Sequence, residues 1–503
     1  MSKHLAVRRD GSTVELPATL PEAHKVILSL LDVIDDLRAE VVILKAQVAA
    51  LKEEVADLKE QLNQHSGNSS KPPSQDSPGQ RDKRPGKPPT GNKKGAQPGH
   101  RKHSRMMADE AAVDGMKHYY PDGQCACGGD IALEAEPRLR HQVFDLPEVK
   151  YTVTEHRVYA GCCTRCGKHC QGGLPDDVPK GQMGPGLIAG IGLLNGGHRL
   201  STRAVQSWLV EQWGLRFSLG AINESQEKLA EWLKAPHADI GVAVRASAVV
   251  HADETTHYRY SAEQGLERHW LWALTAGPAV YFRTHYSRGK RAAGSLLEGF
   301  DGVLVTDRLG SYNCHPQERR QVCLAHVIRN LTAMSQRKGE SGRLGKRLVR
   351  LLRLVFRVEH GWRQGRYDEN RYRHRLDQLQ SAFHQGIAQG SEWTSCKKTM
   401  NQCRQLLRDE PMLWTFRRYP DVPLTNNAAE RAVRPYVIWR KTSFFSQSAR
   451  GDRFRERILS VTESCKRLGV MAYAFLRKVC EQGIQNQPVT VRLPFQNSIP
   501  ALS

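Results

Sequence analysis

Two acidic residues in the second half of the chain lie where a sheet could bring their carboxylates together. The β-like run VRASAVVHADE contains Asp253 near its end, and GVLVTD is typical of a short buried strand that ends in Asp307. Open α/β sheets bind their ligands at the carboxyl ends of strands. Mg²⁺ prefers a few carboxylates together with phosphate oxygens, and two ions about 4 Å apart can serve an in-line displacement. The spacing therefore predicts a site for two metal ions.

A third carboxylate is offered by Glu430 in the run NNAAER. Asn427 is a good N-cap, which would put Glu430 at position N3 of the helix that starts there. Other interpretations stay open from these residues alone. Asp307 suits a turn, and Glu430 could close a capping box with Asn427. Glu254 competes with Asp253, but strand alternation places neighbours on opposite faces, so only one can point into the site.

The segments around these acids predict a mixed sheet with helices packed on it. HWLWALTA and AVYFRTHY indicate a hairpin, GKRAAGSLLEGF a helix, and RQVCLAH a strand that leads into the helix AHVIRNLTAM. Between His326 and Asn426 the chain is mostly helical in pattern and strongly basic. That stretch could be an insertion that only packs on the core, or one that also contacts DNA.

Four cysteines ahead of the predicted sheet suit a structural zinc ion. Cys125 and Cys127 form a C-x-C pair, Cys163 and Cys166 form a C-x-x-C pair, and a glycine follows each pair. Thiolates that converge on tetrahedral Zn²⁺ need sharp turns of this kind. The alternative is a set of free buried cysteines in a small β-rich domain. The intervening run from 141 to 160 has the alternation of strands.

Residues 24–64 carry a heptad pattern that neither Pro nor Gly interrupts. β-Branched residues at a and leucines at d favour a parallel two-stranded coiled coil, in which Glu40 would face Lys45 of the other chain. The alternative is an amphipathic helix that packs on its own core with period 3.6. Five heptads in strict register favour a dimerisation helix. The a positions are Ile27, Ile34, Val41, Val48, Val55 and Leu62, and the d positions are Leu30, Leu37, Leu44, Leu51 and Leu58.

Residues 66–105 contain no Val, Ile, Leu, Phe, Trp or Tyr. Such a segment cannot bury enough apolar area to offset its ordering entropy, so we expect a disordered linker. The formal net charge of the chain is +22. That imbalance favours a polyanion, because Lys and Arg that neutralise phosphates release counterions, although a solvated basic surface is the alternative. The linker is therefore either a plain spacer or a segment that also tracks a DNA backbone.

Residues 183–235 predict two helices joined by a short turn, which is compatible with a helix-turn-helix as well as with an ordinary helical hairpin. No stretch approaches the ~20 apolar residues that cross a bilayer, and the N-terminus lacks the apolar core of a secretory signal. We therefore expect a cytoplasmic protein whose cysteines stay reduced.

The order of the motifs resembles the large transposase of the insertion sequence 66 family of bacterial mobile elements. NSSKPPSQD and GAQPGH are similar to its linker signature, and the Cys163/Cys166 pair to its zinc-binding module. HADET, SRG, GVLVTD with SYN, and CLAH resemble successive blocks of its catalytic domain. NNAAERAVRP, WRKTSFF and SVTESCKRLG resemble its C-terminal blocks. A series of blocks in this order is far more specific than any one motif.

The resemblance implies a DDE-type transposase with an RNase H-like core, in which Asp253, Asp307 and Glu430 match the three catalytic acids. It implies two bound Mg²⁺ ions, with Mn²⁺ as an alternative, and a structural Zn²⁺. It further implies cleavage at the ends of a mobile element, joining of the 3′-hydroxyls to target DNA, and accessory proteins that the element encodes. After Glu430, the basic residues that could hold phosphates near the scissile site are Arg434, Arg440 and Lys441, and the equal alternative is that they form surface charge.

Two positions depart from the family pattern. The first cysteine pair is usually C-x-x-C, whereas Gln124 stands here before Cys125. Arg308 follows Asp307 where the family has Gly, so the local turn is expected to differ. Cys323 and His326 match a family C-x-x-H block, and we expect them to pack beside the active site, with a metal-binding role as the alternative.

The expected fold class is multidomain α/β: an RNase H-like mixed sheet with a helical insertion, preceded by an N-terminal coiled coil and a small zinc-binding module. The expected partners are DNA and a second copy of the chain, with a higher oligomer on nucleoid DNA and no membrane. A catalytically inactive or domesticated DNA-binding relative is the competing interpretation. The expected segments are an N-terminal segment 1–23, coiled coil 24–64, linker 65–110, zinc module 111–180, helical segment 181–240, catalytic core 241–336, insertion 337–422, C-terminal core helices 423–485 and tail 486–503.

Overall fold

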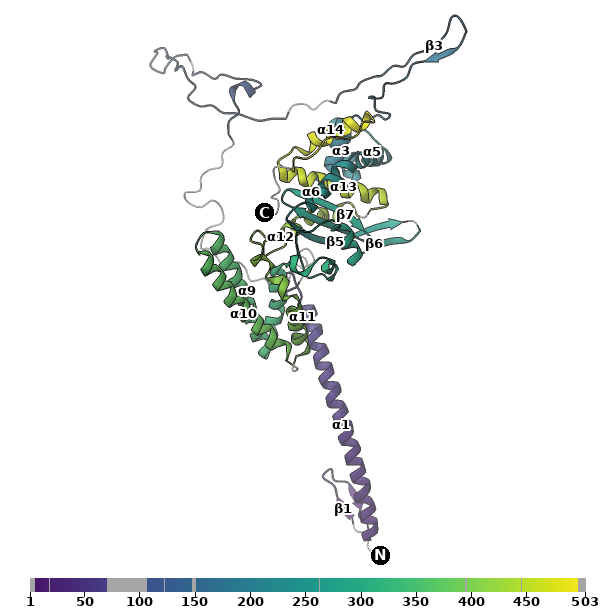
Figure 1. Ribbon diagram of the computed structural model, residues 1–503, viewed down its shortest axis with the longest axis vertical. Coiled ribbons are helices and arrows are strands. Elements are labelled where there is room, and N and C mark those ends of the chain that lie inside the picture. Colours follow the sequence, from purple (N-terminus) through teal and green to yellow (C-terminus); the bar gives the residue numbers. More distant parts are fainter. Residues whose placement is uncertain are drawn as a thin grey trace. The chain divides into compact units, whose positions relative to one another are not determined.

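A computed structural model describes residues 5–17, 19–69, 106–121, 123–146, 151–261, 263–393, 396–444 and 446–495. Most of the predicted linker therefore lies outside the described residues. The chain divides into two compact units (Figure 1). The helical unit comprises Met1–Arg84 and Leu324–Glu410, and the sheet unit comprises Pro85–Cys323 and Pro411–Ser503.

The sheet unit is built on a mixed five-stranded sheet, as the strand patterns predicted. Its strand order is β7-β6-β5-β8-β9. β5, β6 and β7 pair antiparallel, whereas β8 is parallel to β5 and β9 is parallel to β8. The strands are β5 Val249–Ser261, β6 Gly265–Ala276, β7 Ala279–His285, β8 Val303–Thr306 and β9 Arg320–Val322.

Helices pack against this sheet and against one another to form the core of the unit. α12 contacts β5 and β6, α6 and α13 contact β7, and α3 packs on α5 and α14 (Figure 1). The helices of the unit are α3 Pro185–Gly192, α4 Thr202–Trp213, α5 Leu219–Trp232, α6 Lys234–Arg245, α7 Lys290–Leu296, α12 Asn427–Thr442, α13 Ala449–Leu468 and α14 Ala472–Ile484. α4 and α5 are the two helices predicted between 183 and 235, and Gly214 joins them with a left-handed φ of 67°.

The edge strand β7 is covered by side chains of α13. The hydroxyl oxygens of Ser464 and Ser460 accept the N–H groups of Val280 (3.0 Å) and Phe282 (2.9 Å). An unpaired strand edge would otherwise present these donors to another chain. α13 therefore completes the hydrogen bonding of the sheet where no sixth strand follows.

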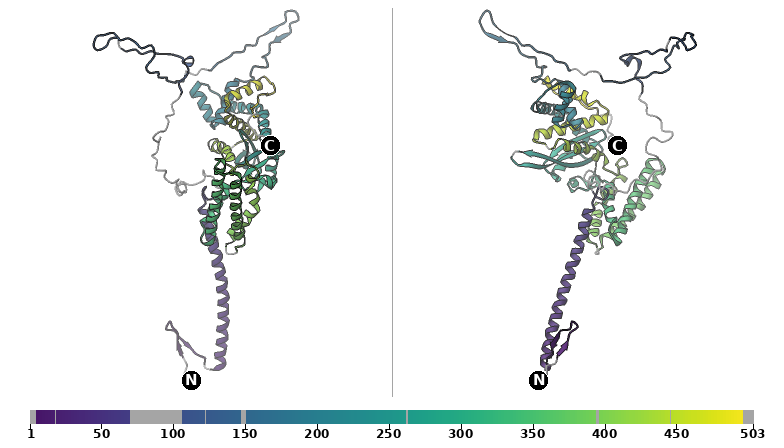
Figure 2. Two further views of the ribbon diagram at one scale, coloured as in Figure 1. Left: turned by 60° about the vertical axis from the view of Figure 1, so that its left-hand side comes forward. Right: turned by 180° about the vertical axis from the view of Figure 1, so that it is seen from behind.

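The helical unit contains four helices that follow β9 and one long N-terminal helix. α1 Leu20–Leu62 is a single uninterrupted helix with no buried residue (Figure 2). Its last turns are held by ion pairs from Arg337 to Glu60 (3.2 Å) and from Lys398 to Asp57 (3.0 Å). The others are α8 Leu324–Ser335, α9 Gly339–Arg363, α10 Glu369–Ser391 and α11 Lys397–Leu413, whose last residues belong to the sheet unit.

Outside these elements the chain forms two small hairpins and extended segments. The hairpins are β1 Leu5–Val7 with β2 Thr13–Glu15, and β3 Ala160–Cys162 with β4 His169–Gln171. The prediction of strands across 141–160 was wrong for the described residues 141–146 and 151–159, which form none. Their alternating apolar side chains are mostly exposed, because no second layer lies against them. Within the described residues, no helix is long and apolar enough to cross a membrane.

Candidate active site

The register of two parallel strands brings Asp253 and Asp307 together. His251 of β5 pairs with Val305 of β8. The same register, continued by two residues, sets Asp253 opposite Asp307, which directly follows the last residue of β8. Each carboxylate accepts a nearby backbone N–H, from Glu254 to Asp253 (2.9 Å) and from Leu309 to Asp307 (2.9 Å).

Glu430 reaches the same region from α12, and Asn426 fixes the start of that helix. The Asn426 side chain donates to the carbonyl of Ala252 (2.7 Å) and lies 3.0 Å from Nδ1 of His251. The N-cap is Asn426 rather than Asn427, and its side chain makes no cap hydrogen bond. The alternative interpretation, a capping box between Asn427 and Glu430, is therefore not formed, because the N-cap residue is Asn426 and its side chain binds β5.

Further contacts fix α12 along β5. Nη1 of Arg440 donates to the hydroxyl of Thr255 (2.9 Å). One turn earlier on α12, the Tyr436 hydroxyl contacts Nδ1 of buried His257, whose Nε2 lies 2.7 Å from Asp452. Burial lowers the pKa of His257, so the neutral imidazole donates from Nε2 to Asp452 and accepts the Tyr436 hydroxyl at Nδ1. The network holds the Glu430 helix in one position over the strand of Asp253.

Burial makes Asp253 and Asp307 hard to ionise, and like charge adds to the effect at Asp253. Burial raises the pKa of Asp253 well above its usual value, and the charges of Glu254, Asp307 and Glu430 raise it further. Burial also raises the pKa of Asp307, against the opposing effects of the Leu309 N–H and nearby arginines. Carboxylates that repel one another in a buried place are the donor set that a divalent cation neutralises. The residues therefore fit bound Mg²⁺.

Glu254 lies close enough to these acids for its charge to raise the pKa of Asp253, but its carboxylate oxygens bind other partners. One carboxylate oxygen accepts from Nε (2.9 Å) and Nη2 (2.6 Å) of Arg288, and the other accepts the Tyr312 hydroxyl (2.7 Å). The Arg288 guanidinium lies over the ring of Trp270, 4.7 Å from its centroid. Strand alternation predicted that only one of Asp253 and Glu254 points into the site. The sequence did not reveal the set of Glu254, Arg288 and Tyr312, whose only local signal was the SRG motif that contains Arg288.

Arg308 adds a positive charge close to Asp307. Its charge, with those of Arg288 and Arg320, lowers the pKa of Asp307 and offsets part of the effect of burial.

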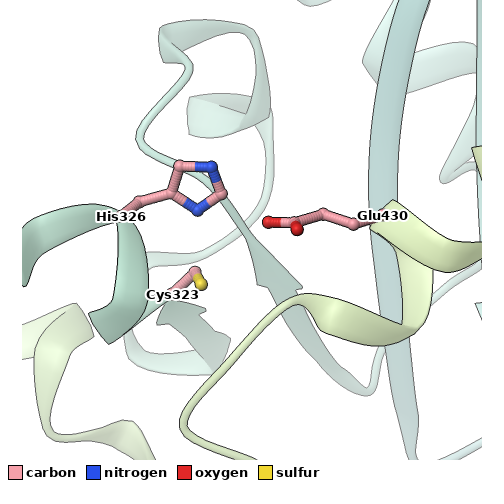
Figure 3. Close-up of side chains that lie close together, drawn as sticks. All are labelled: Cys323, His326 and Glu430. Carbon is pink, nitrogen blue, oxygen red and sulfur yellow. The ribbon is translucent and has the colours of Figure 1, made fainter. Parts of the chain in front are cut away.

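Cys323 lies beside the third acid (Figure 3). Its sulfur is within 4.8 Å of a Glu430 carboxylate oxygen and accepts the backbone N–H of Asn426 (3.2 Å). Figure 3 also labels His326, which belongs to the first turn of α8 in the helical unit. In the sheet unit, the predicted packing of Cys323 beside the acids is confirmed.

The four predicted zinc ligands lie on two tight turns. The Cys125 N–H donates to Gly129 (2.9 Å) and the Cys163 N–H donates to Lys168 (2.8 Å), and the glycine after each pair has a positive φ. Hydrogen bonds from the backbone N–H of Cys127 and of Arg165 lower the pKa values of the Cys125 and Cys163 thiols. Within the described part of the chain, the two pairs are not gathered into one ligand group.

The three basic residues predicted to contact phosphate all lie on α12. Arg434 and Lys441 are exposed, whereas Arg440 is half-buried and bonded to β5. Asn426, His257 and Asp452 were missed by sequence reasoning, because their partners lie more than a hundred residues away along the chain.

The family match agrees with this arrangement. A family model described as "Transposase IS66 family" matches residues 180–453, which is more than half of the chain. The chain therefore belongs to the IS66 transposase family, as the motifs predicted. A second model, "Family of unknown function (DUF6444)", matches residues 19–106.

Similar proteins from Sinorhizobium fredii (strain NBRC 101917 / NGR234) carry no functional description. The chain is 25% identical over 276 residues to "Uncharacterized protein y4qI", a match that covers 49% of this chain and 50% of the relative. It is 25% identical over 304 residues to "Uncharacterized protein y4jD", covering 55% of this chain and 58% of the relative. The chain thus spans little more than half the length of these two relatives. For "Uncharacterized protein y4hP" the identity is also 25%, over 427 residues, with 74% and 72% covered.

The repulsion within the acid cluster predicts a stabilising substitution. Since the folded-state pKa of Asp253 is raised, its penalty on folding grows as pH rises above the usual value of 3.8 and is complete above the folded-state pKa. In Mg²⁺-free buffer at pH 8, Asp253→Asn should therefore be more stable than the natural chain by about 1 kcal/mol or more. Thermal melting at pH 8 and pH 5 measures the gain, which should shrink at the lower pH.

Asp421→Asn, at an exposed acid, is the control and should leave the melting temperature nearly unchanged. Mg²⁺ should raise the melting temperature of the natural chain and do so much less for Asp253→Asn. A less stable Asp253→Asn protein in Mg²⁺-free buffer would contradict the proposed repulsion.

Proposed function

We propose that this chain is a DDE transposase that binds the ends of a mobile DNA element, cleaves phosphodiester bonds and joins the 3′-hydroxyl ends to target DNA. The observation that carries the proposal is the convergence of Asp253, Asp307 and Glu430 from two neighbouring strands and a helix, with charges that act on one another. Membership of the IS66 transposase family supports the same activity.

The topology supports an RNase H-like core. Three antiparallel strands, β5 to β7, are followed by β8 and β9, which extend the other side of β5 in parallel. In chain order the five strands therefore lie 3-2-1-4-5, and the acids sit on the first strand and just after the fourth. The helical stretch between β9 and α12 then interrupts this core as an insertion.

In the proposed mechanism, Asp253, Asp307 and Glu430 would hold two Mg²⁺ ions, or Mn²⁺ in their place. Such ions supply Lewis-acid activation of the attacking oxygen and stabilise charge on the leaving oxygen. Water as the attacking group hydrolyses the bond and frees a 3′-hydroxyl. That hydroxyl, as the next attacking group, forms a new phosphodiester with target DNA while one target bond breaks. Arg434, Arg440 and Lys441 are proposed to hold the flanking phosphates.

Glu254 and Tyr312 would orient Arg288 beside this chemistry. Burial of the Glu254 carboxylate makes its contact with Arg288 a strong restraint on the guanidinium, whose side chain is still 42% exposed. The stacking on Trp270 removes one further degree of freedom. Arg288 would thus offer a fixed positive charge close to Asp307.

We also propose a structural zinc ion held by Cys125, Cys127, Cys163 and Cys166. The two glycine-containing turns and the lowered thiol pKa values favour the thiolate form that zinc binds. The extended segments between the pairs bury little apolar area of their own. Zinc would therefore hold this part of the chain together.

A homodimer through α1 is the proposed assembly, with a higher oligomer on DNA. Along the heptad seam every a and d side chain of α1 is exposed, for example Val41 at 45% and Leu44 at 50%. An apolar stripe of this length on one helix is typical of an interaction surface. We propose that the protein acts on the nucleoid in the bacterial cytoplasm, together with accessory proteins of the element.

The second candidate function is DNA binding without catalysis, in an inactive or domesticated relative. The coiled coil, the linker and the cysteine turns would serve that function equally well. The observation that favours an enzyme is the acid cluster, because mutually repelling buried carboxylates oppose both folding and phosphate binding.

The central test replaces each acid by its amide. Asp253→Asn, Asp307→Asn and Glu430→Gln should each lose Mg²⁺-dependent cleavage and strand transfer by at least ~100-fold, while binding of element ends persists. Glu430→Gln should also keep its stability, since no capping box depends on this side chain. Cleavage of labelled element ends, DNA binding and thermal melting are measured together. A folded, DNA-binding Glu430→Gln protein that still cuts would end the assignment of the third acid.

Zinc content tests the cysteine turns. The purified chain should contain about one Zn²⁺, and the double variant Cys163→Ser, Cys166→Ser should lose it. Cys162→Ser with Cys170→Ser, two neighbouring thiols outside the proposed set, is the matched control and should retain the metal. Metal analysis of the three proteins decides the point, and equal zinc in all of them would refute this ligand set.

The coiled coil is tested by charge placed in the seam. Leu44→Lys with Val48→Lys should convert dimers to monomers in sedimentation experiments on the DNA-free protein, because two lysines would face their copies across a parallel dimer. Val42→Lys with Ala46→Lys adds the same charge outside the seam and should leave the dimer intact. Dissociation by both pairs, or by neither, would contradict a dimer through this face.

A further inference from the structure

One face of α9 is built to pack inside the helical unit. Its buried side chains recur at helical spacing and meet α8 and α10. Glycines allow a close approach on both sides: a Cβ at Gly345 would lie 2.4 Å from the Ser335 nitrogen, and one at Gly390 of α10 would lie 2.7 Å from Leu344. The principal apolar residues of this face are Leu344, Leu348, Leu352, Val355 and Val358. α9 is therefore held firmly along its length.

The opposite face of α9 carries basic side chains and is exposed. These residues follow one another at intervals of one, three or four positions, so they form one continuous line on the outer surface of the helix. We call this line the α9 stripe. Its members are Arg343, Lys346, Arg347, Arg350, Arg353 and Arg357.

The positive charges of the stripe are almost entirely uncompensated. Among the members of the stripe, and within the part of the chain that the structure describes, only Arg343 at the start of α9 forms an ion pair, with Glu340 at 3.6 Å. Across the described residues, the other five members form no ion pair or hydrogen bond. The other acid of the helix, Glu359, lies on the buried side and bonds Arg363 (2.7 Å) and Tyr372 (2.5 Å).

Such an arrangement opposes the stability of the helix that carries it. Like charges three and four positions apart repel one another. On α10 the arginines are compensated, since Arg373 pairs with Glu369 (2.5 Å) and Arg375 lies over the Tyr367 ring. The unpaired stripe is thus a local feature of α9, and folding alone gives no reason for it.

We propose that the α9 stripe binds the phosphate backbone of duplex DNA without reading its sequence. This inference rests on the proposed function, in which DNA is the substrate. The fourteen steps along the helix from Arg343 to Arg357 extend over about 21 Å at 1.5 Å per residue. That length exceeds the major-groove width of about 12 Å, so the stripe can reach phosphates on both strands.

The composition of the stripe favours duplex DNA over other polyanions. Single-stranded nucleic acid is bound through aromatic side chains on which bases stack, and the stripe contains none. An amphipathic helix binds a membrane by inserting its apolar face, which α9 uses inside the helical unit. Arginine and lysine without Asn or Gln are suited to phosphates, which carry no sequence information.

The experiment measures the salt dependence of DNA binding with the full chain in Mg²⁺-free buffer, so that cleavage does not enter. The probe is a duplex of arbitrary sequence. Arg347→Gln, Arg350→Gln and Arg353→Gln are combined, since Gln retains helix propensity and these side chains are exposed. The slope of log affinity against log salt should fall in magnitude by about 2 to 3, because each lost phosphate contact removes about 0.9.

The matched control combines Arg371→Gln, Arg373→Gln and Arg375→Gln on α10, which removes the same charge from the same unit. Its slope should change by less than about 1. Equal changes of the salt slope in both triple variants would mean that net charge alone causes the effect, and this would contradict the proposal. An unchanged slope in the α9 variant would contradict it too. The proposal would also be contradicted if the α9 variant lost binding to anionic vesicles but kept its affinity for the DNA duplex. Failure of the proposed function would give a different result, because the natural chain would then bind DNA but would not cleave it when Mg²⁺ is added.

Discussion

The parallel pairing of β5 with β8 is the constraint on which the site depends. It places Asp253 and Asp307 at the same level of neighbouring strands, where burial and mutual repulsion both oppose their charges. This placement lowers the folding stability of the sheet, and it fixes the pair of carboxylates in position before any ligand binds. Everything packed around the pair has to hold it in that position against repulsion.

The support comes from the last third of the sequence. Asn426 binds the strand of Asp253 at the residue before that acid. Beyond the acid, Arg440 binds Thr255 and Tyr436 contacts His257. α12 is thereby attached to β5 along its length, and Glu430 has little freedom to move away from the other acids. The third acid is thus positioned by hydrogen bonds to the strand that carries the first.

Local patterns in the sequence were sufficient for the strands and for the acids at their ends. Apolar runs with turn residues after them located β8 and Asp307. The alternating pattern failed between 141 and 160, because a strand also needs a partner and a layer to pack on. The contacts of His251 with Asn426 and of His257 with Asp452 join residues 175 and 195 positions apart, which no local pattern encodes. The start of α12 was misjudged by one residue for the same reason, since the Asn426 side chain is used by β5.

The covering of β7 by α13 has a consequence for synthesis on the ribosome. β7 ends at His285, and the serines that accept its N–H groups are Ser460 and Ser464. At about 5–20 residues per second, the ribosome needs roughly 10 to 35 seconds to make the chain in between. During that interval the nascent sheet has one open edge, while α8 to α10 can already fold as a unit of local contacts. A chain that terminates within that interval keeps the open edge permanently, so truncated products are expected to associate with one another or to be degraded.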